Sequence, residues 1–118
     1  MTIKKERFIS VDIEASGPVP GKYNLLSIGA CLVSDTDVNF TCELKPITRE
    51  YIPAALEVTG LTLEELEDRG LPPEEAMLAF KNWIDQVTSS TTLPVFVGLN
   101  APFDWSFVNY YFHVYLGE

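Results

Sequence analysis

The sequence predicts a mixed α/β domain in which a meander of three antiparallel strands is followed by helices and then by a strand parallel to the first. Apolar or alternating runs at residues 7–13, 25–33 and 38–44 are joined by short links, which is typical of a meander. A further apolar run at 93–99 follows a segment of helical periodicity, 53–87, which favours a crossover to a parallel strand. We therefore expect one mixed sheet with flanking helices.

The first strand, residues 7–13 (RFISVDI), alternates apolar and polar positions. Val11 and Ile13 share one face, so Asp12 lies on the other face. Glu14 follows two positions after Asp12 and is expected to face the same way.

The next two strands are separated by links rich in turn-forming residues. GPVPG at 17–21 is a loop by its glycine and proline content, and LLSIGACLV at 25–33 has the nearly continuous apolar run of an interior strand. SDTD at 34–37 forms the turn into VNFTCEL at 38–44, where every second residue is apolar.

Two short helices are predicted after the meander. Residues 53–60 (PAALEVTG) end at a glycine, and the next helix opens at Thr62 with Glu65 in the spacing of a capping box and closes at Gly70. The acidic run that follows Thr62 is most simply a solvated helix face; it consists of Glu64, Glu65, Glu67 and Asp68.

Two longer helices are predicted at 72–87 and 100–116. The first has proline and acids in its first turn and an apolar stripe that we expect to be core, not a surface on which bases stack. That stripe is Ala76, Met77, Phe80, Trp83, Ile84 and Val87. The stripe expected on the second helix is Phe103, Phe107, Tyr110, Tyr111 and Val114.

The composition fits a single compact domain, residues 1–118, of which 47% are apolar. Seventeen acidic residues against eight basic ones give a net charge of −9. This balance argues against a broad surface for nucleic acid or an anionic membrane, so a phosphate-bearing partner would need a local bridge such as a metal ion. With no export signal and no apolar run of membrane-spanning length, we expect a soluble cytoplasmic protein.

The two cysteines, Cys31 and Cys42, lie inside strand-like runs without CxxC spacing and with no histidine nearby. We expect both to be buried small residues, because this pattern does not favour a structural disulfide or a thiolate metal site.

Polar side chains follow the carboxyl ends of the first and fourth strands. Asp12 and Glu14 end the first strand, and Asn100 and Asp104 come just after the fourth. Sites in open α/β sheets form at this edge, so three carboxylates converge there if the two strands are neighbours. Clustered carboxylates raise each other's pKa unless a cation lies between them, and Mg²⁺ or Mn²⁺ takes oxygen ligands while leaving positions for phosphate and water. Phosphodiester hydrolysis is the predicted chemistry.

Simpler explanations exist for some of these residues. Asp104 alone would suit a helix dipole, and Asn100 alone would suit a helix N-cap. Asp12 is better explained by metal ligation, because its apolar neighbours give an isolated acid little reason to lie there. One of Phe103 and Trp105 is expected to pack, which leaves the other to approach a nucleotide.

Two segments resemble the motifs of DEDD-type 3′-to-5′ exonucleases, the family of proofreading exonuclease domains, ribonuclease T and oligoribonuclease. FISVDIEASGP (8–18) resembles the first motif, D-x-E followed by a small residue and glycine. GLNAPFDWSFV (98–108) resembles the second motif, an asparagine and then an aromatic residue and aspartate at the start of a helix. The spacer between them, with IPAALEVTGLT and a long amphipathic helix, is also similar to the family's.

The resemblance implies a ribonuclease-H-like fold and hydrolysis of 3′-terminal nucleotides of single-stranded DNA or RNA, or of short oligonucleotides, with two Mg²⁺ or Mn²⁺ ions. Asp12 would bridge both ions, Glu14 would bind the ion on the nucleophile side, and Asp104 would hold the second. Substrate-binding roles are implied for Ala15, Ser16, Gly17, Asn100 and Phe103, the first three through backbone groups near the terminal sugar.

The family's third motif, a fourth aspartate with a histidine five positions before it in the largest subgroup, has no counterpart before Glu118. His113 with Glu118 imitates the spacing, but both belong to the second-motif helix, so we expect a surface or structural histidine. We expect the chain to be a C-terminally incomplete exonuclease domain. A non-catalytic interaction module and another divalent-metal phosphohydrolase are the alternatives. The apolar last helix predicts self-association.

Overall fold

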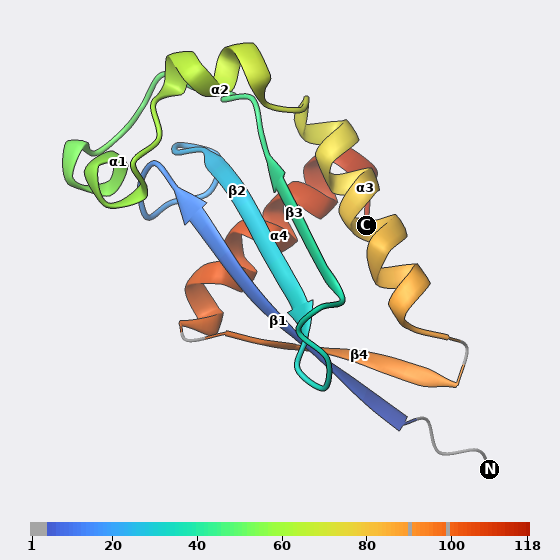
Figure 1. Cartoon of the computed structure of the whole chain (residues 1–118). Helices are drawn as coiled ribbons and strands as arrows, with labels where there is room; N and C mark the ends of the chain where they lie inside the picture. The colour runs from blue at the N-terminus through green and yellow to red at the C-terminus, as the bar shows by residue number, and fades with distance from the viewer. Residues whose placement is uncertain (1–4, 90, 99) are drawn as a thin grey trace.

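The computed structural model describes residues 5–89, 91–98 and 100–118, which form a four-stranded mixed sheet flanked by helices (Figure 1). The strands are β1 (Lys5–Ala15), β2 (Leu25–Leu32), β3 (Asn39–Glu43) and β4 (Thr92–Val97), and their order in the sheet is β3-β2-β1-β4. β1 pairs antiparallel with β2 and parallel with β4, and β2 pairs antiparallel with β3. The predicted meander and the predicted neighbouring parallel strands are both confirmed.

The helices are α1 (Pro53–Thr59), α2 (Leu63–Arg69), α3 (Pro73–Val87) and α4 (Ala101–Leu116). α1 ends at Gly60, whose φ of 70° is in the left-handed region that glycine adopts without strain. α2 opens as predicted, because the Thr62 side chain accepts the Glu65 amide at 3.2 Å. Figure 1 shows α4 running behind the sheet and α1 and α2 gathered at the end where β1 finishes.

The core lies between one face of the sheet and the helices α3 and α4. The alternation predicted for β1 is observed: Ile9, Val11 and Ile13 are buried, whereas Asp12 is exposed. An aromatic cluster around Phe80 joins β3, α3 and α4, and its members are Phe40, Phe80, Trp83 and Phe112. The α3 stripe is therefore core, as predicted, although Trp83 is only half-buried.

The stripe predicted for α4 is wrong at its last member, because Val114 is 53% exposed. Phe107 and Tyr111 are buried as expected, but the second half of the helix packs against α3 through Phe112, whose ring centroid lies 5.9 Å from that of Phe80. α4 packs against the sheet in its first half and against α3 in its second half, so its buried face changes along its length. Phe112, Tyr115 and Leu116 also pack against the core. Much of the apolar surface of α4, on which the prediction of self-association was based, is therefore covered within the chain.

Two smaller differences concern the cysteines and the fourth strand. Cys31 and Cys42 are unpaired, as expected, but each is half-buried and not fully buried. The strand predicted at 93–99 runs from Thr92 to Val97, and Leu99 lies outside the described residues. None of the helices in the described ranges has the length and apolarity that a bilayer crossing requires.

A β-bulge interrupts the pairing of β1 with β2 next to the carboxylates. Glu14 stands opposite Ser27, but Ala15 stands opposite Leu25, so one extra β2 residue is inserted between them. In a regular strand, residues three apart lie on opposite faces, but the bulge allows Leu25 and Ile28 both to reach the main core. The extra residue, Leu26, is buried in a second cluster with α2.

A buried polar network fixes the loop after β3 to the end of β1. The Asn24 side chain accepts the amides of Ile47 and Thr48 at 2.7 and 2.9 Å and donates to the Thr48 carbonyl at 3.0 Å. The Ser16 hydroxyl accepts the Asn24 amide at 2.8 Å and donates to the Glu50 carbonyl at 3.0 Å. Asn24 and Ser16 are completely buried, so their polar atoms depend on these partners.

Replacing Asn24 by alanine is expected to lower the free energy of unfolding by about 2–4 kcal/mol, because two partly buried amides lose their acceptor. Urea denaturation monitored by circular dichroism measures this change. Asn39→Ala is the matched control: Asn39 is exposed and its side chain bonds only to carbonyls of its own turn, so a loss within about 0.5 kcal/mol is expected. Equal losses in the two variants would contradict a structural role for the network.

Candidate active site

Asp12 and Glu14 extend from the face of β1 opposite the core, near the strand's carboxyl end. Asp12 is exposed and Glu14 is half-buried. Both line a groove of about 520 Å³ on this open face of the sheet, together with β2 and β3 residues that include Ser27, Gly29 and Thr41. The two acids predicted from alternation therefore share one accessible surface.

Asp104 reaches the same strand from α4. The last paired residue of β4 is Val97, opposite Ser10, so β4 no longer covers the edge of β1 beyond that point. There the Asp104 carboxylate accepts the backbone amide of Ile13 at 3.3 Å, and the residue is only 7% exposed. The first and fourth strands are therefore neighbours, and Asp104 lies close enough for its charge to act on Glu14.

The three carboxylates repel one another. Burial raises the pKa of Glu14 above its ordinary value, and the charges of Asp12 and Asp104 raise it further. Burial is also the main cause that raises the pKa of Asp104; the Ile13 amide opposes this shift and Asp12 adds to it. A cation between these groups would relieve the repulsion.

The donor set fits hard divalent ions, because carboxylate oxygens are the ligands that Mg²⁺ and Mn²⁺ prefer. In the described part of the chain, no three acidic, cysteine or histidine side chains lie close enough to hold one ion together. The fit therefore rests on the chemistry and mutual repulsion of Asp12, Glu14 and Asp104, with Asp12 the most exposed of them.

Gly98 allows Asp104 to approach β1. A Cβ atom at Gly98 would lie 3.0 Å from the Asp104 Oδ2 atom and 3.1 Å from the Val11 carbonyl oxygen. The glycine is thus needed for space. Gly98 was not among the predicted site residues, although it is the first residue of the segment that resembles the second motif.

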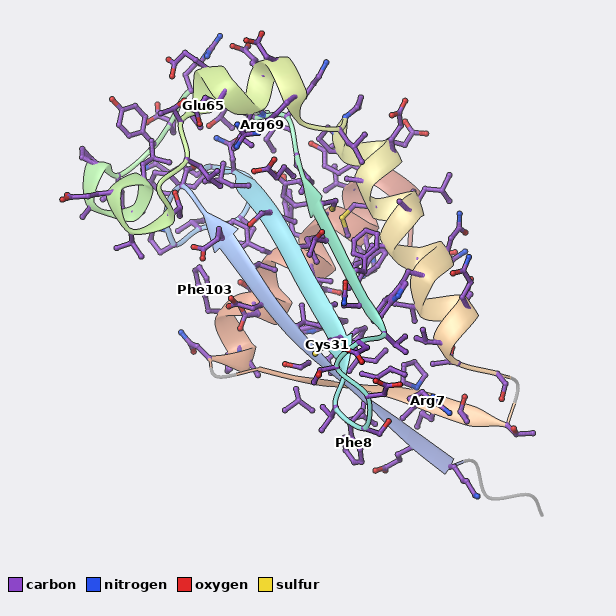
Figure 2. All side chains as sticks on the ribbon, in the orientation of Figure 1. Arg7, Phe8, Cys31, Glu65, Arg69 and Phe103 are labelled. Atoms are coloured by element: carbon purple, nitrogen blue, oxygen red, sulfur yellow. The ribbon has the colours of Figure 1, made fainter. Side chains whose placement is uncertain are left out.

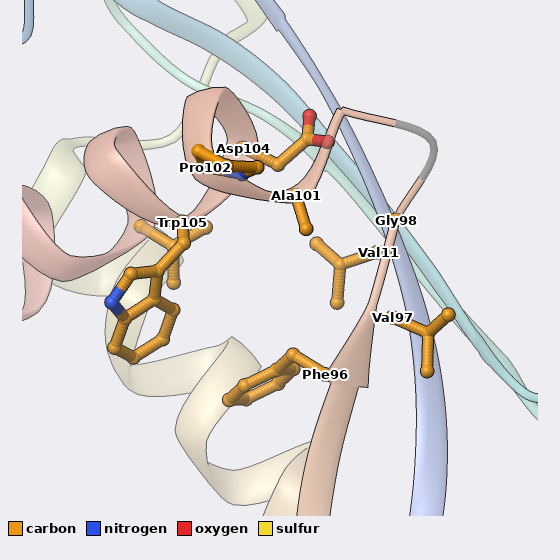
Figure 3. A pocket seen from close by; sticks show the side chains of 9 residues that line it. Val11, Phe96, Val97, Gly98, Ala101, Pro102, Asp104 and Trp105 are labelled. Carbon is orange, nitrogen blue, oxygen red and sulfur yellow. The ribbon is translucent and has the colours of Figure 1, made fainter.

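An apolar pocket of about 320 Å³ adjoins Asp104 between β4 and α4 (Figure 3). The rings of Phe96 and Trp105 stack with centroids 5.5 Å apart, and Val11 lies beside them. The Asp104 carboxylate lies at the end of the pocket away from the Phe96 ring. Trp105 is 46% exposed, whereas Phe103 is half-buried against Phe107 with ring centroids 5.3 Å apart. Trp105 is therefore the more exposed of the two rings.

The other predicted site residues differ in accessibility. Ala15, Ser16 and Gly17 are buried, and the Ser16 amide and carbonyl bond to Asn24 and Ile52. Asn100 is exposed and occupies the N-cap position of α4, but its side chain makes no capping hydrogen bond.

Phe103, labelled in Figure 2, lies in the first turn of α4. His113 is exposed, as expected, and lies nine residues beyond Asp104 on α4, roughly 13 Å along the helix axis.

Glu14→Gln is expected to raise the free energy of unfolding at pH 7 when a chelator removes divalent ions. A carboxyl whose pKa is raised by folding stabilises the protein below its unfolded pKa, and that stability is lost as the pH rises through the folded pKa. The advantage of the variant should therefore shrink as the pH is lowered, and Mn²⁺ should stabilise the parent more than the variant. Urea denaturation at several pH values measures this, with exposed Glu57→Gln as the control. A variant less stable than the parent at pH 7 would contradict the repulsion.

Gly98→Ala is expected to weaken Mn²⁺ binding by on the order of tenfold, because the added methyl group displaces Asp104. Titration calorimetry measures the affinity. An added Cβ at Gly117, which follows the far end of α4, meets nothing within 4 Å, so the control variant Gly117→Ala should retain the parent affinity. Equal affinities for all three proteins would show that Gly98 does not position the carboxylate.

Comparisons with known proteins agree with this geometry. No family model matches the sequence. The 3′-5′ DNA exonuclease Cap18 of Escherichia coli is 58% identical over all 118 residues, and the chain spans 63% of that relative's length.

Solved structures of exonuclease I have the same fold. The enzyme from Methylocaldum szegediense superposes with a TM-score of 0.74 at 20% identity, over 93% of this chain and 24% of that one. Exonuclease I from E. coli in complex with a dA16 oligonucleotide gives a TM-score of 0.73 at 20% identity, over 92% and 24%. The predicted ribonuclease-H-like fold is therefore confirmed, and the chain is a relative, over its whole length, of a 3′-5′ DNA exonuclease.

Proposed function

We propose that this chain is the carboxylate-bearing part of a metal-dependent exonuclease that hydrolyses phosphodiester bonds at the 3′ end of single-stranded nucleic acid. The observation that carries the proposal is the meeting of Asp12, Glu14 and Asp104, from two segments far apart in the sequence, at the carboxyl end of β1. DNA is the first substrate to test, because the relative that is 58% identical is named a DNA exonuclease.

Each carboxylate has a distinct place in the proposed mechanism. Asp12, exposed in the groove, is the acid best placed to contact both ions, and Glu14, half-buried beside it, would orient a water molecule. Asp104 is held against the Ile13 amide and would complete the set from the α4 side. Two divalent ions would supply a nucleophile at neutral pH and stabilise the leaving oxygen.

Substrate choice follows from charge and shape in this proposal. With a net charge of −9, the protein repels a phosphate backbone except where bound cations neutralise the groove. This favours short or loosely held single strands over long duplex, whose binding depends on many basic contacts. Strong binding to long duplex at physiological salt would contradict it.

The remaining predicted site residues would act mainly by position. Ala15, Ser16 and Gly17 lie beneath the surface, where a Cβ at Gly17 would come within 2.3 Å of the Tyr23 ring, so we propose that they shape the end of β1 near the terminal sugar. Phe103 and Asn100, at the start of α4, would flank the 3′-terminal nucleotide. Residues 1–118 would form part of one exonuclease domain.

The test is Mn²⁺-dependent release of mononucleotides from a single-stranded DNA oligonucleotide labelled at its 3′ or its 5′ end. We expect early release of the 3′ label and a loss of more than about 100-fold in rate for Asp12→Asn, because a shared metal ligand is removed. Asp85→Asn is the matched control, since Asp85 is exposed on α3 and should leave the rate unchanged.

Other outcomes identify the alternatives. Hydrolysis of small phosphomonoesters without polarity on oligonucleotides would indicate a different phosphohydrolase. Absence of hydrolysis by a protein that still binds Mn²⁺ through Asp12 would indicate a non-catalytic module or a need for further residues.

A further inference from the structure

Tyr111 connects α4 to β2, the strand that pairs with the acid-bearing strand β1. Its side chain is completely buried, and its hydroxyl oxygen accepts the backbone amide of Leu25 at 2.9 Å. Leu25 is the first residue of β2 and stands opposite Ala15, immediately across the β-bulge from Glu14. A side chain seven residues after Asp104, about two helical turns further on, therefore binds the backbone of β2 at the bulge.

The bulge begins immediately after Glu14. Up to Glu14 the pairing of β1 with β2 is regular, with Ser27 opposite Glu14; beyond Glu14 one residue of β2 is skipped, and Leu25 stands opposite Ala15. Ser27 lines the same groove as Glu14, while Leu25 enters the main core. Leu25 therefore pairs with β1 at the residue directly after Glu14, where the regular ladder has ended.

We infer that Tyr111 is a positioning residue that holds the bulge through its hydroxyl and thereby fixes the Glu14 carboxylate beside Asp12 for metal binding. The bulge is held from two sides. The Ser16 hydroxyl binds the amide of Asn24, and the Tyr111 hydroxyl binds the amide of the next residue, Leu25. The inference concerns metal binding. It rests on the proposed function only for the purpose of the bound metal, which is hydrolysis.

The hydroxyl has no other evident reason to be buried. Packing of the ring against the core requires only an aromatic side chain, and a buried hydroxyl is unfavourable unless it is hydrogen-bonded. The partner here is a backbone amide at the bulge, not solvent or a neighbouring side chain. Removing only the oxygen atom therefore separates the positioning role from the packing role.

The test compares Tyr111→Phe with Tyr115→Phe in Mn²⁺ binding, measured from the electron paramagnetic resonance signal of free Mn²⁺. Tyr115 is on the same helix, half-buried, with its ring centroid 5.2 Å from that of Tyr111. We expect Mn²⁺ affinity to fall by on the order of tenfold in Tyr111→Phe and to be unchanged in Tyr115→Phe. Amide hydrogen exchange should accelerate at Leu25 and Glu14 in the first variant only. Unchanged affinity in a folded Tyr111→Phe protein would overturn the inference.

A double-mutant cycle identifies the carboxylate through which Tyr111 acts. In the Glu14→Gln background, the effect of Tyr111→Phe on Mn²⁺ affinity should disappear, whereas in the Asp104→Asn background it should persist. The reverse result would mean that Tyr111 acts by placing α4, and would overturn the inference. If the parent binds Mn²⁺ and shows this pattern but hydrolyses no oligonucleotide, the proposed function fails while the role of Tyr111 stands.

Discussion

The hydrogen bond from the Ile13 amide to the Asp104 carboxylate joins residues 91 positions apart and decides where the acidic groups meet. It exists because β4 ends at Val97 and leaves the edge of β1 uncovered just where the strand carries its acids. An unpaired amide at this edge requires an acceptor, and α4 supplies one that is also charged. The same contact therefore completes the sheet's hydrogen bonding and brings a third carboxylate to Asp12 and Glu14.

This arrangement places mutually repelling charges on the strand that the fold depends on most. β1 is the strand that belongs both to the meander and to the parallel pair, and its apolar face forms part of the core. Burial and the neighbouring acids raise the pKa of both Glu14 and Asp104, so the site opposes folding at neutral pH unless a cation is present. Ile9, Val11 and Ile13 stabilise the strand from its other face, which is how one strand can tolerate the charges.

The fold and the acids could be predicted from the sequence because both follow from local patterns. Alternation along β1 separates Asp12 from the core, and the spacing of glycines and caps marks α1 and α2. The motif residues stand out because metal ligation demands carboxylates. Val114 was misjudged because its exposure depends on where α3 crosses α4, and local periodicity contains no information about a helix's neighbours.

The roles of Asn24, Gly98 and the Tyr111 hydroxyl were not predicted, for a related reason. Each satisfies a need created by tertiary structure: an acceptor for loop amides, space beside a carboxylate, and a partner for an amide at the bulge. These needs arise between segments far apart in the sequence, so local periodicity does not indicate them. α4 carries both Asp104 and Tyr111. A shift of this one helix would therefore move the Asp104 carboxylate and also loosen the Leu25 backbone beside Glu14. Geometry at Glu14 is therefore controlled from a helix that Glu14 itself need not contact.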